Sequence, residues 1–128
     1  MTNGRTDLSE VQLHLVDNIE EAGNFLRWLG ERRPHNAISV DIETGERKGG
    51  AKKDAFSPWH GDIRLVQVGD GMTGWAIPWK NWSGVFYQGM SQFTGPIICH
   101  NIAFEAKWFA VSSEWEIPWE RAHDTMIM

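Results

Sequence analysis

Asp41 and Glu43 stand one residue apart at the end of an apolar stretch that begins near Ile38. Because side chains alternate between the two faces of a strand, we expect both carboxylates on one face and the apolar neighbours on the other. Adjacent carboxylates repel unless a cation neutralises them or one of them holds a proton. A hard divalent cation such as Mg²⁺ meets that need. The alternative is a solvated acidic strand end, which the spacing of the two acids alone favours.

A second group of polar residues, His100, Asn101 and Glu105, follows another short apolar stretch at residues 97–99. Asn101 is a residue type that caps helices, and we expect it to begin a helix that runs to about Val111. Glu105 then lies just past the first turn, where the positive end of the helix dipole stabilises a carboxylate. That position is common for an acid and does not by itself require a ligand.

The composition indicates one folded domain. The chain has 128 residues, 41% of them hydrophobic, which is enough for a packed core. The net charge of -5 provides no general basic field for nucleic acid, yet it does not exclude a nuclease, because metal-binding acids lower the net charge. No apolar run is as long as a membrane span, and the polar first residues lack the apolar segment of a signal peptide. We therefore expect a cytoplasmic protein with no membrane partner.

Hydrophobic periodicity predicts alternating strands and helices after a flexible amino terminus at residues 1–10. The predicted domain covers residues 11–128. The expected strands are residues 12–16, 37–43, 63–69, 73–79 and 97–100, and the expected helices are residues 18–29, 81–93 and 102–111. Residues 123–128 are expected to end a strand and enter another helix.

The order of these elements predicts the sheet. The strands at residues 37–43, 63–69 and 73–79 are expected to form a three-strand meander, and the next helix carries the chain across to the strand at residues 97–100. Because such crossovers are nearly always right-handed, we place that strand beside the first one and parallel to it. Ligands gather at the carboxyl ends of strands in sheets of this kind. The two acidic groups should therefore meet at one end of the sheet.

Basic residues are densest in a glycine- and lysine-rich loop at residues 45–61, which holds Arg47, Lys48, Lys52 and Lys53. A solvated loop is the slightly favoured interpretation. The functional interpretation is a mobile arm that contacts phosphates beside the acidic residues.

Two segments resemble, in order, the first two motifs of the DEDD 3′→5′ exonuclease superfamily. Residues 41–44 (Asp-Ile-Glu-Thr) resemble the first motif, and residues 100–105 (His-Asn-Ile-Ala-Phe-Glu) resemble the second. Residues 63–70 and 123–126 resemble flanking segments of the proofreading domain of the bacterial and phage DNA polymerase I family. The resemblance thus covers about residues 12–128. RNase D-like nucleases share the same motifs.

The resemblance implies an α/β fold with an RNase H-like mixed sheet, in which a three-strand meander and parallel strands are flanked by helices, incomplete at the carboxyl end. It also implies a phosphodiesterase that uses two Mg²⁺ or Mn²⁺ ions held by Asp41, Glu43 and Glu105 as catalytic ligands. The implied reaction releases nucleoside 5′-monophosphates from the 3′ end of single-stranded DNA, with RNA as the other substrate.

Four further residues would bind the substrate if the resemblance holds. Thr44 and Asn101 would contact the terminal nucleotide, Phe104 would shape its pocket, and His100 would reach a phosphate or sugar.

The sequence departs from the family in two ways. Glu105 stands where the family usually has Asp, which lengthens the side chain by roughly 1.5 Å. The third motif, a Tyr or His followed by Asp, is missing, because the one tyrosine, Tyr87, precedes the second motif and Asp124 matches another segment. One metal ligand is therefore missing. The alternatives are an inactive nucleic-acid- or nucleotide-binding module, a truncated polymerase fragment, or an RNase D-like ribonuclease; self-association or a complementing chain is also expected.

Overall fold

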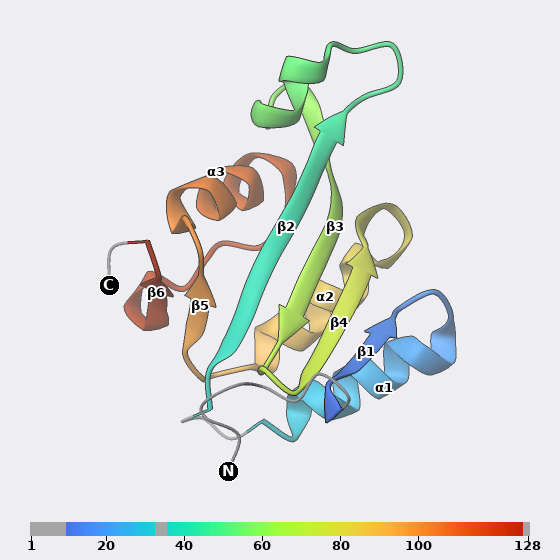
Figure 1. Ribbon diagram of the computed structural model, residues 1–128, viewed down its shortest axis with the longest axis vertical. Coiled ribbons are helices and arrows are strands. Elements are labelled where there is room, and N and C mark those ends of the chain that lie inside the picture. Colours follow the sequence, from blue (N-terminus) through green and yellow to red (C-terminus); the bar gives the residue numbers. More distant parts are fainter. Residues whose placement is uncertain (1–9, 33–35, 127–128) are drawn as a thin grey trace.

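A computed structural model describes residues 10–32 and 36–126. In these residues, six strands form one mixed sheet in the order β1-β4-β3-β2-β5-β6 (Figure 1). The strands are β1 (Gln12–Leu15), β2 (Ile38–Glu46), β3 (Gly61–Gly69), β4 (Thr73–Pro78), β5 (Ile97–Cys99) and β6 (Ala122–Asp124). The helices are α1 (Ile19–Gly30), α2 (Trp79–Gln92) and α3 (Ile102–Ser112), with two 3₁₀ turns, η2 (Lys52–Phe56) and η3 (Trp119–Arg121). The expected flexible segment lies almost entirely outside the described residues.

The strand pairings confirm the predicted topology. Strands β2, β3 and β4 form the antiparallel meander, and β5 lies beside β2 and parallel to it. Strand β6 continues the sheet in parallel beyond β5, while β1 pairs in parallel with β4 at the other edge. The register pairs β5 with Ile38 and Ser39, so the chain leaves β5 for α3 beside the middle of β2. Strand β2 is longer than the expected strand at residues 37–43, and its two acids therefore lie in mid-strand and not at its carboxyl end.

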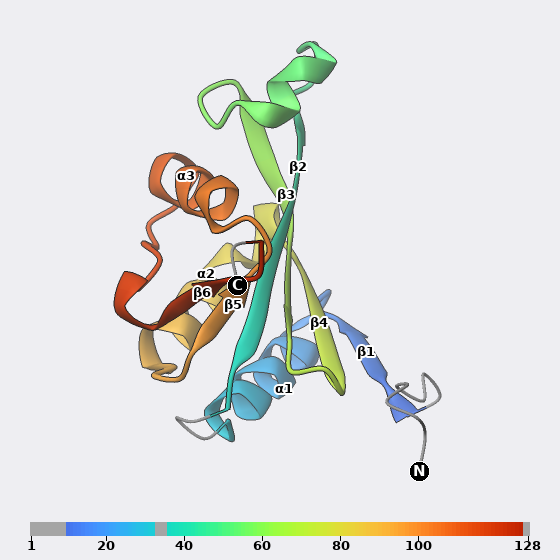
Figure 2. The same ribbon diagram turned by 60° about the vertical axis from the view of Figure 1, so that its left-hand side comes forward.

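The three helices cover one face of the sheet and leave the other face open (Figure 2). Apolar side chains from alternate positions of the central strands fill the covered side, including Val40, Val66, Val68 and Ile77. Their burial supplies the main favourable term for folding. None of the described helices combines the length and the apolar character that a membrane span requires.

Helix α1 begins at the residue that the sequence predicts, but one of its apolar side chains is exposed and not buried. The side chain of Asn18 accepts a hydrogen bond of 2.8 Å from the backbone N–H of Glu21, which caps the first turn. Phe25 and Leu29 pack into the core. The spacing of Ile19 from Phe25 and Leu29 predicts that it shares their buried face, but this prediction is wrong, because its side chain is 85% exposed. It occupies the first helical position, where the helix starts beside the edge of the sheet.

Two glycines in α2 have different surroundings. A Cβ at Gly84 would meet nothing within 4 Å, whereas a Cβ at Gly89 would lie 2.7 Å from Cδ2 of Leu29 and 3.3 Å from Cε2 of Phe25. Gly89 therefore weakens the helix locally but lets α2 approach α1 closely. Gly84 has no such compensation.

Substituting these glycines one at a time should separate the two effects. Gly84→Ala is expected to stabilise the fold by about 0.5–1 kcal/mol, because alanine favours the helix. Gly89→Ala is expected to destabilise it by roughly 1 kcal/mol or more, because the added methyl group overpacks the contact with α1. Urea unfolding midpoints measure both changes. Equal shifts in the two variants would contradict this account of Gly89.

Candidate active site

Strand β2 presents Asp41 and Glu43 on its open face. Both residues are exposed, while Val40 and Ile42 are buried under the helices, as the alternating pattern predicts. The pairing with β3 shifts between Glu43 and Thr44, which leaves one extra residue on β3. A β-bulge of this kind bends a strand and increases its twist. The bend lies directly after the two acids.

Glu105 is the one buried charged side chain among the described residues, with 1% of its surface exposed. It lies in the first turn of α3, and its Oε2 atom has no hydrogen-bond partner. Burial raises the pKa of Glu105 to about 8, and a shared hydrogen bond with Asp41 and the negative charge of Asp41 also raise it. Glu105 therefore holds a proton at neutral pH unless a cation replaces that proton.

The carboxyl groups fit a divalent cation in part. Asp41 and Glu105 supply oxygens from two different elements, and the free Oε2 of Glu105 can accept a cation. Glu43 lies two residues further along the same face of β2, roughly 7 Å away at the usual strand rise. Within residues 10–32 and 36–126, however, no three His, Cys, Asp or Glu side chains form a ready metal-binding group. Glu43 would have to turn toward the other two.

The start of α3 is fixed by a residue distant in sequence. Asn101 has a left-handed backbone, with φ 77 and ψ 66, and its side chain makes no capping hydrogen bond. The predicted cap by Asn101 is therefore wrong. The carboxylate of Asp124 instead accepts hydrogen bonds from the backbone N–H groups of Asn101 at 3.0 Å, Ile102 at 3.1 Å and Met126 at 2.9 Å. The exposed side chain of Asn101 is left free of the capping role.

These hydrogen bonds from backbone N–H groups also lower the pKa of Asp124. The hydrogen bond from Met126, followed by those from Asn101 and Ile102, holds the pKa of Asp124 below its usual value, and His100 contributes a favourable charge. Asp124 thus stays ionised while it caps the helix. Sequence reasoning matched this residue to a family segment without assigning it a role at the site. The signal that could have identified Asp124 is its position: it ends β6, which runs parallel to β5, and the chain enters α3 directly after β5.

His100 lies beside the open face of the sheet. Its Nδ1 atom is 2.8 Å from the hydroxyl of Thr125, and the N–H of Thr125 donates to the Cys99 carbonyl at 2.9 Å. A hollow of about 620 Å³ brings Asp41, His100 and Thr125 into one wall. One predicted site residue from each segment, Asp41 and His100, therefore lines this hollow, whereas Glu43, Asn101 and Glu105 do not.

The other candidate residues occupy different surroundings. The hydroxyl of Thr44 donates to the backbone carbonyl of Ala55 and so holds the connection between β2 and β3. Phe104 is half-buried, with its ring centre 6.1 Å from that of Trp108 one turn on. Tyr87 accepts a hydrogen bond from the N–H of Glu114 and packs in an aromatic cluster on the covered face. It is therefore not placed to orient a nucleophile at Asp41.

No family model matches this sequence, and no curated protein matches it. Solved structures do match the fold. The catalytic core of RRP6 from Trypanosoma brucei superposes with a TM-score of 0.69 at 17% identity, covering 95% of this chain and 31% of that one. The chain has an RNase H-like fold.

Two further structures share this fold. The EXO domain of Aedes aegypti Nibbler gives a TM-score of 0.57 at 16% identity, covering 82% of this chain and 45% of that domain. Trypanosoma brucei RNase D in complex with the RNA U12 gives 0.56 at 17% identity, covering 77% and 33%. The chain thus spans less than half the length of each of these proteins.

The raised pKa of Glu105 predicts a pH dependence of stability in metal-free buffer. The ordinary glutamate value is 4.5 and the folded value is about 8, so between these pH values the folded chain binds a proton that the unfolded chain lacks. Stability should therefore fall as the pH rises from about 4.5 to 8. Glu105→Gln keeps the shape and cannot ionise, so it should be more stable than the wild type by roughly 1–3 kcal/mol at pH 8.

Urea unfolding at pH 5 and pH 8, with a chelator present, measures this difference. The advantage of Glu105→Gln should be small at pH 5 and should grow with pH. The same pH slope in both proteins would contradict a protonated, buried Glu105.

Proposed function

We propose that this chain is a metal-dependent 3′→5′ exonuclease domain that acts on single-stranded nucleic acid. The observation that carries the proposal is the buried carboxyl of Glu105 beside Asp41, in a fold shared with RRP6 and RNase D. Burying a carboxyl with an unpartnered oxygen costs stability. A bound cation would offset that cost and ionise both carboxyls.

Asp41 and Glu105, with Glu43 turned toward them, would hold Mg²⁺ or Mn²⁺. Such ions, when bound, lower the pKa of an attacking water and stabilise the leaving 3′ oxygen. The protein side chains would place the terminal nucleotide. His100 faces the hollow and Asn101 is exposed at the start of α3. Because Asp124 occupies the first N–H groups of α3, side chains rather than this helix end would contact the phosphate.

RNA is the substrate that we favour. The structures that share the fold include an RNase D bound to an RNA, and this supports the RNase D-like interpretation. Single-stranded DNA is the second candidate, because residues 123–126 resemble a segment of polymerase proofreading domains. A module that binds nucleic acid without cleaving it is the alternative from another class, and the open arrangement of Glu43 favours it.

Cation binding can be tested without measuring catalysis. Adding Mn²⁺ or Mg²⁺ should raise the unfolding free energy of the wild type at pH 7.5, by about 1.4 kcal/mol when the cation is tenfold above its dissociation constant. Asp41→Asn and Glu105→Gln should each remove this gain, because each loses a charged ligand. Glu20→Gln, on the exposed side of α1, is the matched control and should keep it. An undiminished gain in Asp41→Asn would refute the site.

Cleavage can be followed with 12-nucleotide RNA and DNA strands labelled at the 5′ end. The wild type with Mn²⁺ should shorten them stepwise from the 3′ end, RNA faster than DNA. Asp41→Asn should slow the reaction at least about a hundredfold, a loss typical of removing one group that stabilises transition-state charge. Metal binding without cleavage of either strand would instead support the non-catalytic module.

A further inference from the structure

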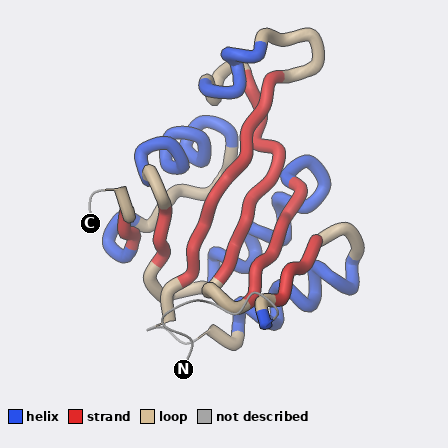
Figure 3. The backbone as a smooth tube through the Cα atoms, in the orientation of Figure 1, coloured by secondary structure: helices blue, strands red, loops and turns tan. Residues whose placement is uncertain are grey.

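The connection between β2 and β3, residues 47–60, extends beyond the body of the molecule (Figure 3), and we call it the arm. The arm carries four cationic side chains and one acidic one, in a chain whose net charge is -5. The sequence predicts either a solvated loop or a phosphate-contacting arm in this region.

Two aromatic side chains of the arm are exposed. Phe56 is 71% and Trp59 is 64% exposed, and the turn η2 buries none of its residues. These rings therefore contribute little to the packing of the fold. Two exposed rings and four cationic side chains within one segment are the groups from which a binding surface can be built. Stacking on nucleic-acid bases uses the same combination of aromatic rings and cations.

Most of the charge on the arm faces solvent. Arg47 is paired with Asp62 at 3.0 Å. In the part of the chain that the structure describes, Lys48, Lys52 and Lys53 form no ion pair with an acid. These three lysines are free to contact phosphates, and such contacts do not depend on base sequence.

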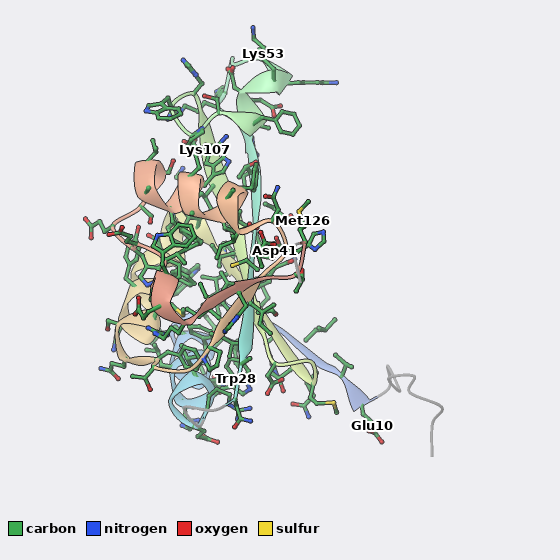
Figure 4. The ribbon with its side chains drawn as sticks, turned by 90° about the vertical axis from the view of Figure 1, so that its left-hand side faces the viewer. Glu10, Trp28, Asp41, Lys53, Lys107 and Met126 are labelled. Atoms are coloured by element: carbon green, nitrogen blue, oxygen red, sulfur yellow. The ribbon has the colours of Figure 1, made fainter. Side chains whose placement is uncertain are left out.

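The base of the arm is attached to both elements that carry the acidic site. Thr44, on β2, donates to the Ala55 carbonyl. From α3, Lys107 donates to the Phe56 carbonyl at 3.4 Å and Ser112 donates to the Pro58 carbonyl at 3.2 Å. The arm therefore has a fixed position relative to Asp41 and Glu105. Figure 4 shows Lys107 between Lys53 and Asp41 along the long axis of the molecule.

The distance from Asp41 to the arm determines how many nucleotides a bound strand needs in order to contact both. Arg47, the first residue of the arm, is six positions after Asp41, which is roughly 20 Å at the usual strand rise. Stacked nucleotides are spaced by about 3.4 Å along one strand. A strand would need roughly six nucleotides to reach from Asp41 to the arm.

We propose that the arm is a second contact surface for single-stranded nucleic acid, where Phe56 and Trp59 stack on bases and Lys48, Lys52 and Lys53 contact phosphates. The proposal rests on the proposed function, because it places the 3′ end of the strand at Asp41. The arm holds the strand about six nucleotides upstream of that end. It thereby favours long strands over short ones, without preference for base sequence.

Binding of fluorescein-labelled strands, followed by anisotropy in EDTA, tests the arm separately from cleavage. The probes are 12-mers and 4-mers of oligouridylate and oligothymidylate. Phe56→Ala and Trp59→Ala should each weaken 12-mer binding at least about fivefold and leave 4-mer binding unchanged. Replacing Lys52 and Lys53 together by Gln should lower the magnitude of the slope of log K against log salt by about 1.4.

The matched controls lie away from the arm. Trp119→Ala removes another exposed ring, 56% exposed on η3, and Arg27→Gln removes a cation of α1. Both should bind the 12-mers as the wild type does. Because Phe56 and Trp59 are largely exposed, the arm variants should retain the wild-type unfolding midpoint, so a loss of binding cannot be attributed to unfolding.

Three outcomes decide the proposal. Weaker 12-mer binding confined to the arm variants supports it, even if the wild type cleaves neither strand and the exonuclease proposal fails. Equal 12-mer affinity in the wild type and in the arm variants overturns it, even if Asp41→Asn abolishes cleavage. Binding to phosphatidylserine vesicles that Phe56→Ala abolishes, with 12-mer binding unchanged, also overturns it, because the arm would then be a membrane contact.

Discussion

The contact between the carboxyl groups of Asp41 and Glu105 is the constraint on which the rest of the site depends. One group is exposed on β2 and the other is buried on α3, and burial raises the pKa of Glu105 to about 8. A proton or a cation must therefore occupy the pair. The parallel pairing of β5 with the first residues of β2 makes this contact possible, because it places the start of α3 beside the middle of β2, where Asp41 lies.

A long-range cap holds α3 in that position. Asp124 comes from β6 and binds the first N–H groups of α3, where a local residue would ordinarily serve. This arrangement links β5, α3 and β6 into one unit around the turn at Asn101. The same segment places Thr125 against His100. The polar side chains at the end of β5 are therefore positioned by hydrogen bonds rather than by apolar packing.

The side chains that stabilise the fold and those proposed to bind a substrate lie on opposite faces of the sheet. All three described helices pack on one face of the sheet, where the large apolar side chains are buried. The open face carries Asp41 and a hollow, and the arm projects from the end of the same strand. Substitutions at the exposed face or on the arm should therefore change binding more than folding. The fold is shared with exonuclease domains, whereas the arguments for binding come from these particular side chains.

The sequence by itself determined that buried and exposed side chains alternate along β2, that β2, β3 and β4 form a meander, and that β5 lies parallel to β2. It also determined that the segment with Asp41 and Glu43 lies near the segment that begins α3. These features follow from periodicity and chain connectivity, which are local or nearly so. Only the tertiary structure decided that Ile19 is exposed, that Gly89 contacts α1 and that Asp124 replaces Asn101 as the cap. Each depends on neighbours distant in sequence. The raised pKa of Glu105 is of the same kind, because burial and the charge of Asp41 arise only when the strands pair.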